Sequence, residues 1–195
     1  MLISVIVTTY NRPLALRQVL LGLNNQTDTN FEVIVGDDGS RYETRQMIDA
    51  LKPTLRYSLN HVWQEDIGFR LNASRNNGIL ESKGEYLIFL DGDCLPLPDF
   101  VSQHRKLAEK NFMVAGNRCL LNPELTKKIE NGVVNPFSLN WIKFFYYRIF
   151  GGINRLVPLI HLPTNAAFRY WKRNCWPKLR GCNMAFWKED LISVI

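Results

Sequence analysis

The chain alternates between short runs of apolar, β-branched residues and longer segments with apolar residues at helical spacing. The predicted strands cover residues 3–7, 31–35, 55–63, 85–90 and 112–116. The predicted helices cover residues 13–23, 40–51, 72–82 and 98–110. Pro13 suits the first turn of a helix, and Ser40 is expected to cap the next one. Strands alternating with helices predict an α/β fold with a mostly parallel sheet and helices on both faces.

Beyond Asn122 the alternation weakens, and a basic, aromatic segment follows. One helical stripe in this segment is expected to hold Trp141, Phe144, Phe145 and Ile149. Such a segment packs against a core, forms a lid or lies on a membrane surface. Residues 180–187 then predict a short strand, and residues 188–191 the start of a helix.

Composition limits the class of protein. At 195 residues, with 46% hydrophobic and 22% charged residues, the chain fits one globular domain and has no stretch apolar enough to span a bilayer. Residues 1–7 carry no basic leader and predict a strand instead of a signal peptide. The cysteines are Cys94, Cys119, Cys175 and Cys182. Their wide spacing argues against zinc or a disulfide framework and favours reduced thiols in a cytoplasmic setting.

The net charge of +6 is unevenly distributed. Residues 137–188 hold nine Lys or Arg and no acidic residue, whereas the remainder holds 15 basic and 18 acidic residues. Such a stretch is either a solvated basic face or a binding surface for a diphosphate, a phospholipid headgroup or a nucleic acid. Nucleic acid is disfavoured because no RNA-binding motif is present.

The most informative motif is Asp91-Gly92-Asp93, which follows the apolar run of residues 86–90. Two carboxylates at the end of a buried strand need compensation, and Mn²⁺ or Mg²⁺ supplies it through oxygen ligands. Gly92 has no Cβ, so a bulky anion is expected to approach the backbone there. The alternative is an ordinary acidic turn.

Three further polar loops are expected at the same rim of a parallel sheet: residues 10–13, 37–40 and 70–78. Their ring, carboxylates, amides and guanidiniums suit a nucleoside diphosphate. As an alternative, Asp37 closes a turn and Asp38 caps the next helix.

Other common sites are not indicated by the sequence. No Gly-x-Gly-x-x-Gly and no phosphate-binding P-loop motif occurs, and no Ser-His-Asp set has recognisable spacing. The histidines, His61, His104 and His161, are scattered and are expected to be surface or internally satisfied residues.

The ordered motifs at residues 4–12, 35–40, 73–78 and 91–93 resemble those of inverting GT-A glycosyltransferases of family two. The resemblance covers about the first 120 residues. Residues 180–191 resemble the region that follows in galactosyltransferase-like members and in bacterial chondroitin-type polymerase domains. The resemblance implies one GT-A domain over residues 1–195, with a nucleotide-sugar-binding half at 1–120 and a partial acceptor-binding half at 121–195.

The resemblance also implies residue roles. The nucleotide-sugar-binding set is Thr9, Tyr10, Arg12, Asp38, Arg70, Arg75, Asn76, Asp91 and Gly92. The resemblance implies that Asp93 and Asp91 ligate the metal, Mn²⁺ or Mg²⁺. It also implies that Gly181, Cys182 and Asn183 line the pocket for the donor sugar or the acceptor.

The implied reaction moves a sugar from a nucleotide-diphosphate donor, UDP first, to a glycan or lipid-linked acceptor with inversion, in bacterial envelope polysaccharide synthesis. The implied location is cytoplasmic, with peripheral membrane contact through residues 137–160. The family's Trp-Gly-x-Glu-Asp base motif is missing, which leaves Glu189 and Asp190 as candidates. The base is therefore expected beyond Ile195, in a truncated chain that binds nucleotide and transfers sugar poorly.

Two other functions stay open on the sequence. A sugar nucleotidyltransferase uses a similar sheet and metal-binding acids, but its Gly-rich basic loop after the first strand is absent. A non-catalytic module for anionic ligands is the other, carried by the basic stretch.

Overall fold

The computed structural model describes residues 1–159 and 180–192. His161, Cys175 and the last residue of the 137–160 segment lie outside these ranges.

The strands are β1 (Ile3–Thr9), β2 (Phe31–Asp37), β3 (Ser58–Trp63), β4 (Tyr86–Asp91), β5 (Val114–Ala115) and β6 (Asn183–Trp187). The α-helices are α1 (Pro13–Asn24), α2 (Tyr42–Leu51), α3 (Leu71–Glu81), α4 (Phe100–Leu107), α5 (Pro123–Glu130), α6 (Trp141–Ile149) and α8 (Lys188–Ile192). Short 3-10 helices cover Lys52–Thr54, Pro136–Ser138 and Val157–Leu159.

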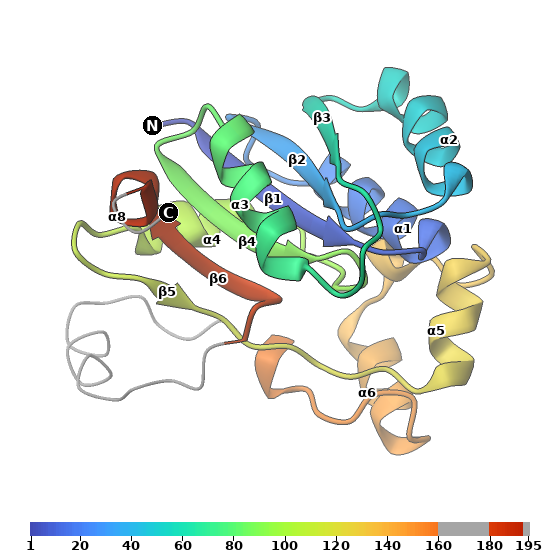
Figure 1. The fold of residues 1–195 in the computed structure, drawn as a ribbon. Helices are drawn as coiled ribbons and strands as arrows, with labels where there is room; N and C mark the ends of the chain where they lie inside the picture. Colours follow the sequence, from blue (N-terminus) through green and yellow to red (C-terminus); the bar gives the residue numbers. More distant parts are fainter. Residues whose placement is uncertain (160–179, 193–195) are drawn as a thin grey trace.

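The six strands form one sheet in the order β3-β2-β1-β4-β6-β5 (Figure 1). Strands β1 to β4 are parallel, whereas β6 runs antiparallel to β4 and to the two-residue β5. The expected α/β fold is therefore confirmed. The fifth predicted strand is shorter than expected, because only two of its residues pair with β6.

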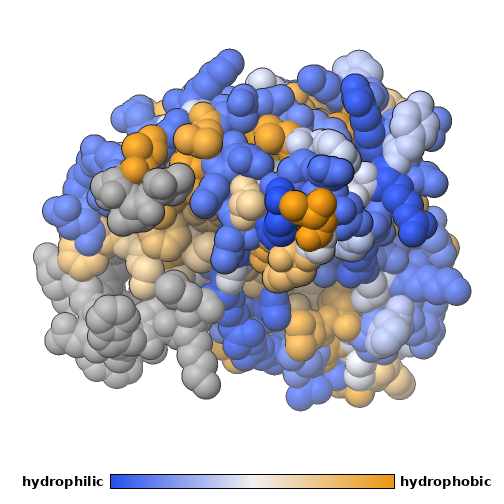
Figure 2. All heavy atoms as spheres, viewed as in Figure 1, coloured by the Kyte–Doolittle hydropathy of each residue, from blue (hydrophilic) through white to orange (hydrophobic). Residues whose placement is uncertain are grey.

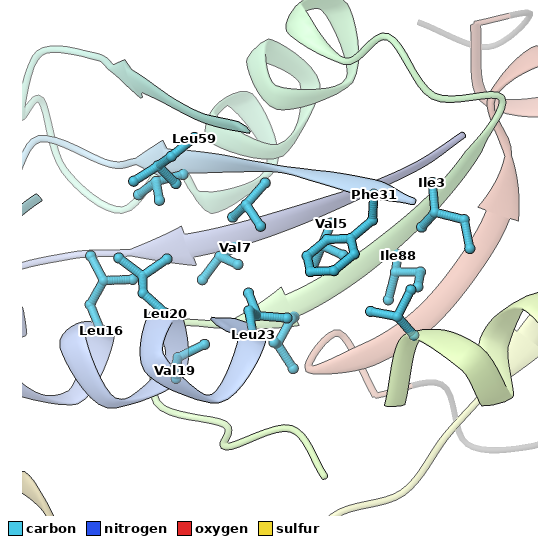
Figure 3. Packing of buried hydrophobic residues seen from close by; sticks show 14 of the residues in the cluster. Ile3, Val5, Val7, Leu16, Val19, Leu20, Leu23, Phe31, Leu59 and Ile88 are labelled. Atoms are coloured by element: carbon cyan, nitrogen blue, oxygen red, sulfur yellow. The ribbon is translucent and has the colours of Figure 1, made fainter. Parts of the chain in front are cut away.

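The larger core lies on the sheet face that α1, α2 and α4 cover. Alternate side chains of β1, Ile3, Val5 and Val7, point toward this face, where α1 presents Leu16 and Leu20 (Figure 3). This alternation follows from the two-residue repeat of a strand, and the spacing on α1 follows from the helical repeat. Each such side chain contributes about 1.5–3 kcal/mol through burial.

Helix α3 covers the opposite face, which is the near face in Figure 1. Ile6 of β1 and Ile79 of α3 belong to this smaller cluster. Gly78 lets the helix approach, because a Cβ on it would lie 2.7 Å from Cγ2 of Ile6. The site-bearing start of α3 is thereby held close to the sheet.

Helix α6, for which the sequence left core packing, a lid and a membrane surface open, buries only part of its predicted apolar stripe. Only Phe144 of the predicted stripe packs inward, beside Tyr147 of the same helix. Trp141, Phe145 and Ile149 are 56%, 60% and 68% exposed. Figure 2 shows apolar side chains over the lower part of the molecule, where α6 lies.

Among the described residues, every helix is too short or too polar to cross a lipid bilayer.

Replacing Leu20 by Ala should lower the free energy of unfolding by about 2–5 kcal/mol, because the fully buried side chain leaves a cavity under β1. Urea denaturation measures the change. Leu14→Ala in the same helix is the matched control: Leu14 is 49% exposed, and its loss should cost under about 0.5 kcal/mol. Equal losses in the two variants would contradict the described packing.

Candidate active site

The carboxyl ends of the parallel strands meet at one edge of the sheet. Thr9 at the end of β1 pairs with Asp37 of β2, and Thr8 pairs with Asp91 of β4. The N–H of Asp38 donates to the Thr9 carbonyl at 3.0 Å, and that of Gly92 donates to the Thr8 carbonyl at 2.7 Å. The loops carrying the predicted motifs are thus neighbours in space.

Asp38 is buried directly after β2, and its carboxylate is held from two sides. Gln64 Nε2 donates to Oδ1 at 2.5 Å, and the N–H of Arg70 donates to Oδ2 at 2.8 Å. Asn77 Nδ2 donates in turn to Gln64 Oε1 at 3.0 Å. Asp38 therefore does not cap α2, but joins the loops after β2 and β3 to α3. Its carboxylate retains lone pairs that can accept from a ligand.

Asp37 closes the turn after β2, since its Oδ1 accepts the N–H of Ser40 at 2.8 Å. Nε2 of His61 lies 2.9 Å from its Oδ2, so this histidine is internally satisfied. Ser40 does not cap α2, because its hydroxyl accepts the N–H of Asn11 at 2.8 Å. Asn11, at φ 51°, occupies the left-handed region that asparagine tolerates, and its Oδ1 accepts the N–H of Arg41 at 2.9 Å. These bonds lock the loops after β1 and β2 together.

Tyr10 presents a half-exposed ring at this rim. Its hydroxyl donates to Asp66 Oδ2 at 2.9 Å, and this hydrogen bond raises the pKa of Tyr10. Gly39 allows the Asp66 backbone to come close, because its φ is +95° and a Cβ would lie 2.6 Å from the Asp66 Cα. The ring is thereby held in a fixed position with a face open to solvent.

Arg12, just before α1, connects three segments of the chain through its guanidinium. Its Nη1 donates to Asp93 Oδ2 at 3.1 Å, and its Nη2 donates to Glu130 Oε1 at 2.7 Å. The start of α1, the loop after β4 and the end of α5 are joined by this one guanidinium.

Arg75 makes the corresponding contact to Asp91. Its Nη2 donates to Asp91 Oδ1 and to the Gly181 carbonyl, both at 3.2 Å. Gly181 leaves room for this, because a Cβ there would lie 2.4 Å from Nη2 of Arg75. The segment before β6 therefore closes the edge next to β4.

The two carboxylates after β4 are not the bare pair that the sequence indicated, since each bonds an arginine. Each nevertheless has an oxygen that can turn to a cation: within the described chain, Asp91 Oδ2 accepts no hydrogen bond, and Asp93 Oδ1 accepts only the weak S–H donor of Cys94 at 3.6 Å. Oxygen donors of this kind, at an edge that can also admit a diphosphate, fit Mn²⁺ or Mg²⁺.

Gly92 serves the sheet more than it serves a ligand. A Cβ on Gly92 would lie 2.8 Å from the Thr8 carbonyl and 3.2 Å from Cβ of Thr9. The close approach of β1 is sufficient to require a glycine here, and the approach of an anion to this backbone stays a prediction. The hydroxyl of Thr9 is buried and has no hydrogen-bond partner in the described chain.

Cys94 and Cys182 lie together beside Asp91. One ligand atom from each of the three residues lies within 4.8 Å of the others. A hydrogen bond with Cys94, reinforced by the neighbouring Arg118, lowers the pKa of Cys182 to about 6. The same thiol–thiol hydrogen bond, together with burial, raises the pKa of Cys94. Sequence spacing gave no sign of this pair, because β6 returns Cys182 to the edge from far along the chain.

A pocket of about 270 Å³ opens beside this cluster, between the loop after β4 and α5. Its polar and charged lining includes Arg12, Asp93, Cys94, Arg118 and Glu130. Its volume is close to the lower limit of small-molecule sites, roughly 300 Å³, and suits part of a ligand.

Three predicted site residues are placed differently from expectation. Asn76 is exposed on α3. Glu189 and Asp190 start α8 at the opposite edge, because antiparallel β6 carries the chain back to Tyr86 at the start of β4. That is a strand length, roughly 15–20 Å, from Asp91. They are therefore wrong as candidates for the base.

Asn183 lies at the predicted edge, but its side chain is already engaged. Its Oδ1 lies 3.0 Å from Nε2 of His104, and its Nδ2 donates to the Asn117 carbonyl at 3.2 Å. His104 is buried, which lowers its pKa to about 4. Asn183 therefore anchors α4 and the residue 117 region to β6.

Sequence reasoning missed Gln64, Asp66, Asn77, Arg118 and Glu130. Gln64 and Asp66 follow directly after β3, so strand-end position alone marks them as candidates. No sequence signal marks Arg118 or Glu130, because both reach the edge through tertiary packing.

Replacing Gln64 by Leu should lower the free energy of unfolding by about 1–3 kcal/mol, because Asp38 and Asn77 lose a buried partner. Thermal and urea unfolding measure the loss. Gln46→Leu, at an exposed position of α2, is the control and should change stability little. A Gln64 variant as stable as the control would contradict the network.

The chain is similar to known glycosyltransferases. A validoxylamine A glucosyltransferase of Streptomyces hygroscopicus subsp. jinggangensis is 39% identical over 102 residues, which is 51% of this chain and 24% of that protein. A GalNAc(5)-diNAcBac-PP-undecaprenol beta-1,3-glucosyltransferase of Campylobacter jejuni subsp. jejuni is 30% identical over 125 residues, 63% of this chain and 39% of that protein. The chain spans less than half the length of either relative.

Among solved structures, mannosyltransferase PcManGT of Pyrobaculum calidifontis, in complex with GDP-Man and Mn²⁺, aligns with a TM-score of 0.53 at 24% identity, over 65% of this chain and 37% of that one. This likeness shows the shared GT-A fold. The family model described as glycosyl transferase family 2 matches residues 4–170, well beyond the first 120 residues that carry the motifs. With that match over most of its length and the motif loops gathered at one sheet edge, the chain belongs to glycosyl transferase family 2.

Proposed function

We propose that this chain acts in the transfer of a sugar from a nucleoside-diphosphate donor to a glycan or lipid-linked acceptor, with inversion and with a divalent cation. The observation that carries the proposal is the convergence of Asp38, Arg75, Asp91 and Asp93 at one edge of the sheet. These residues come from the loop after β2, from the first half of α3, and from the end of β4 with the turn that follows it, and together they offer what a nucleoside diphosphate requires.

The nucleoside is assigned to the loops after β1 and β2. Asp38 is fixed in place by Gln64 and Arg70 and can still accept from a base N–H. The exposed ring of Tyr10 offers a flat face near it. Donors containing uridine are the first choice, and Asn76 is the weakest member of the predicted set because it faces solvent.

The diphosphate is assigned to the space between Arg12 and Arg75. Both guanidiniums now bond the carboxylates after β4, and guanidinium forks also bind phosphate. Asp93 and Asp91 would hold Mn²⁺ or Mg²⁺. A bound cation of this kind neutralises charge on a departing diphosphate.

The acceptor is assigned to the pocket beside α5, with residues 1–120 as the donor half and the later residues as part of an acceptor half. The pocket adjoins Asp93, where the sugar–diphosphate bond would lie. The name of the Campylobacter jejuni relative refers to a lipid-linked glycan, which supports an acceptor of that class. The proton acceptor for the attacking hydroxyl has no assignment among the described residues.

The alternative function, a sugar nucleotidyltransferase, is disfavoured because the family model that matches is one of glycosyl transferases. A purely non-catalytic module is disfavoured because the site residues converge as the enzyme fold requires.

Asp93→Asn should abolish the contribution of Mn²⁺ to UDP binding, because a neutral amide is a poorer cation ligand. Calorimetry with UDP, with and without Mn²⁺, should show at least tenfold tighter binding with Mn²⁺ for the unchanged chain and little difference for the variant. Asp49→Asn is the control, since Asp49 is exposed on α2 and pairs only weakly with Arg45 at 3.7 Å. Equal UDP affinity with and without Mn²⁺ in the unchanged chain would refute the metal role. A thermal-shift screen of UDP-, GDP- and TDP-sugars then ranks the donors.

We also propose that α6 contacts an anionic membrane surface, where a lipid-linked acceptor would reside. Its exposed apolar side chains include Trp141 and Phe145, the exposed Phe150 follows directly after it, and the same helix exposes Lys143 and Arg148. Apolar side chains flanked by basic ones suit the boundary between headgroups and acyl chains.

Changing Trp141, Phe145 and Phe150 together to Ser should reduce sedimentation with vesicles that contain phosphatidylglycerol at least tenfold, because the inserted apolar area is lost. Leu80→Ser removes an exposed apolar side chain from α3 and is the control. Unchanged sedimentation of the triple variant would rule out this helix as the contact.

A further inference from the structure

We propose that Cys94, Cys182 and Asp91 form a binding site for a thiophilic divalent metal, of which Zn²⁺ is the prime example. This site differs in ligand chemistry from the oxygen-only site assigned to Mn²⁺ or Mg²⁺. Two sulfurs and one carboxylate select a softer ion, whereas two carboxylates and a diphosphate select a hard one.

The spacing of the three ligand atoms suits a tetrahedral ion. They lie within 4.8 Å of one another without any ion present. With Zn–S bonds of about 2.3 Å, two sulfurs of a tetrahedral site lie roughly 3.8 Å apart. Side-chain rotation alone closes a difference of this size. Three protein ligands leave the fourth position for water or another ligand.

The backbone holds the ligands in place. Cys182 is buried at the start of β6, and the next residue, Asn183, pairs with Leu90 of β4. The N–H of Cys94 donates to the Asp91 carbonyl at 2.9 Å in the turn that follows β4. The sheet therefore positions all three ligands, although Cys182 lies far from the other two in the sequence.

The surrounding charge also favours a divalent ion. Two thiolates and a carboxylate bring three negative charges, of which Zn²⁺ balances two. Arg118 lies beside Cys182, and Arg75 bonds Asp91 Oδ1 while Oδ2 stays free for the metal. Metal binding requires both sulfurs as thiolates, and the protons that the thiols still carry leave to solvent.

The ion can reach the site from the pocket beside α5. Cys94 lines this pocket, and so does Cys119. Cys119 does not belong to the three-residue cluster. The chain therefore contains its own control: a thiol that shares the pocket without sharing the metal.

One consequence depends on the proposed function. Asp91 cannot serve a thiol-bound zinc ion and the hard cation of a nucleotide complex at the same time. Zn²⁺ should therefore compete with the binding of UDP and Mn²⁺, and zinc occupancy would be an inhibited state of the site.

The test uses the full chain, stripped of metal and kept reduced with a phosphine. Co²⁺ serves as the spectroscopic probe for the Zn²⁺ site. The unchanged chain should bind one equivalent with a sulfur-to-cobalt charge-transfer band, and Zn²⁺ should remove the band. Cys94→Ser and Cys182→Ala should each weaken Co²⁺ binding at least tenfold and diminish the band, whereas Cys119→Ser should leave both unchanged.

Cys94 is only half-buried, so Cys94→Ser keeps the test valid if the Cys182 variant does not fold. Loss of the band in Cys119→Ser, or an unchanged band in Cys94→Ser, would overturn the proposal, as would absence of a thiolate band in the unchanged chain. Calorimetry of UDP with Mn²⁺, with and without Zn²⁺, then tests the competition. If UDP does not bind at all, the cobalt spectra still decide the metal site independently of the proposed function.

Discussion

The site depends on the register in which β1 pairs with both of its neighbours. Thr9 stands opposite Asp37 and Thr8 stands opposite Asp91, so two acidic loops emerge on either side of one strand. A shift of one residue in either ladder would turn the alternating core side chains of β1 toward the wrong face. The packing of Val5 and Val7 on α1 therefore also fixes where the carboxylates stand. Core packing and site geometry are one constraint in this fold.

Charge pairing organises the edge of the sheet where the site lies. Asp93 pairs with Arg12, and Asp91 pairs with Arg75. Each pair is at least partly exposed, so its contribution to stability is small, but it holds long side chains near the place where they are needed. Under the proposed function, binding is an exchange of partners. The carboxylates turn to a cation, the guanidiniums turn to phosphate, and the total charge of the site stays balanced.

Much of the fold could be predicted from the sequence, because hydrophobic periodicity reports which face of an element is buried. The runs at β1, β2 and β4 and the spacing on α1 are clear for this reason. The edge carrying Asp38 and Asp91 followed from the rule that parallel strands end together. The direction of β6 could not be inferred, because the sequence of a short strand does not specify which strand it pairs with or whether the pairing is parallel. The Cys94–Cys182 pair remained unseen for this reason, and the position of Glu189 and Asp190, named only as the acidic residues left after residue 137, could not be judged. The exposure of α6 could not be decided from the sequence, since apolar spacing does not specify what covers a face.

The antiparallel return of β6 has a consequence for how the molecule acquires its shape. Strands β1 to β4 are joined by connections of moderate length, but the contact between Leu90 and Asn183 closes a loop that spans nearly half of the chain. The entropy lost in closing so long a loop is several kcal/mol, and such contacts form late. The wall of the site that contains Gly181 and Cys182 is therefore among the last parts to assemble. During synthesis, the loops after β1 and β2 can therefore fold before the segment that contains Gly181 and Cys182 has paired with β4.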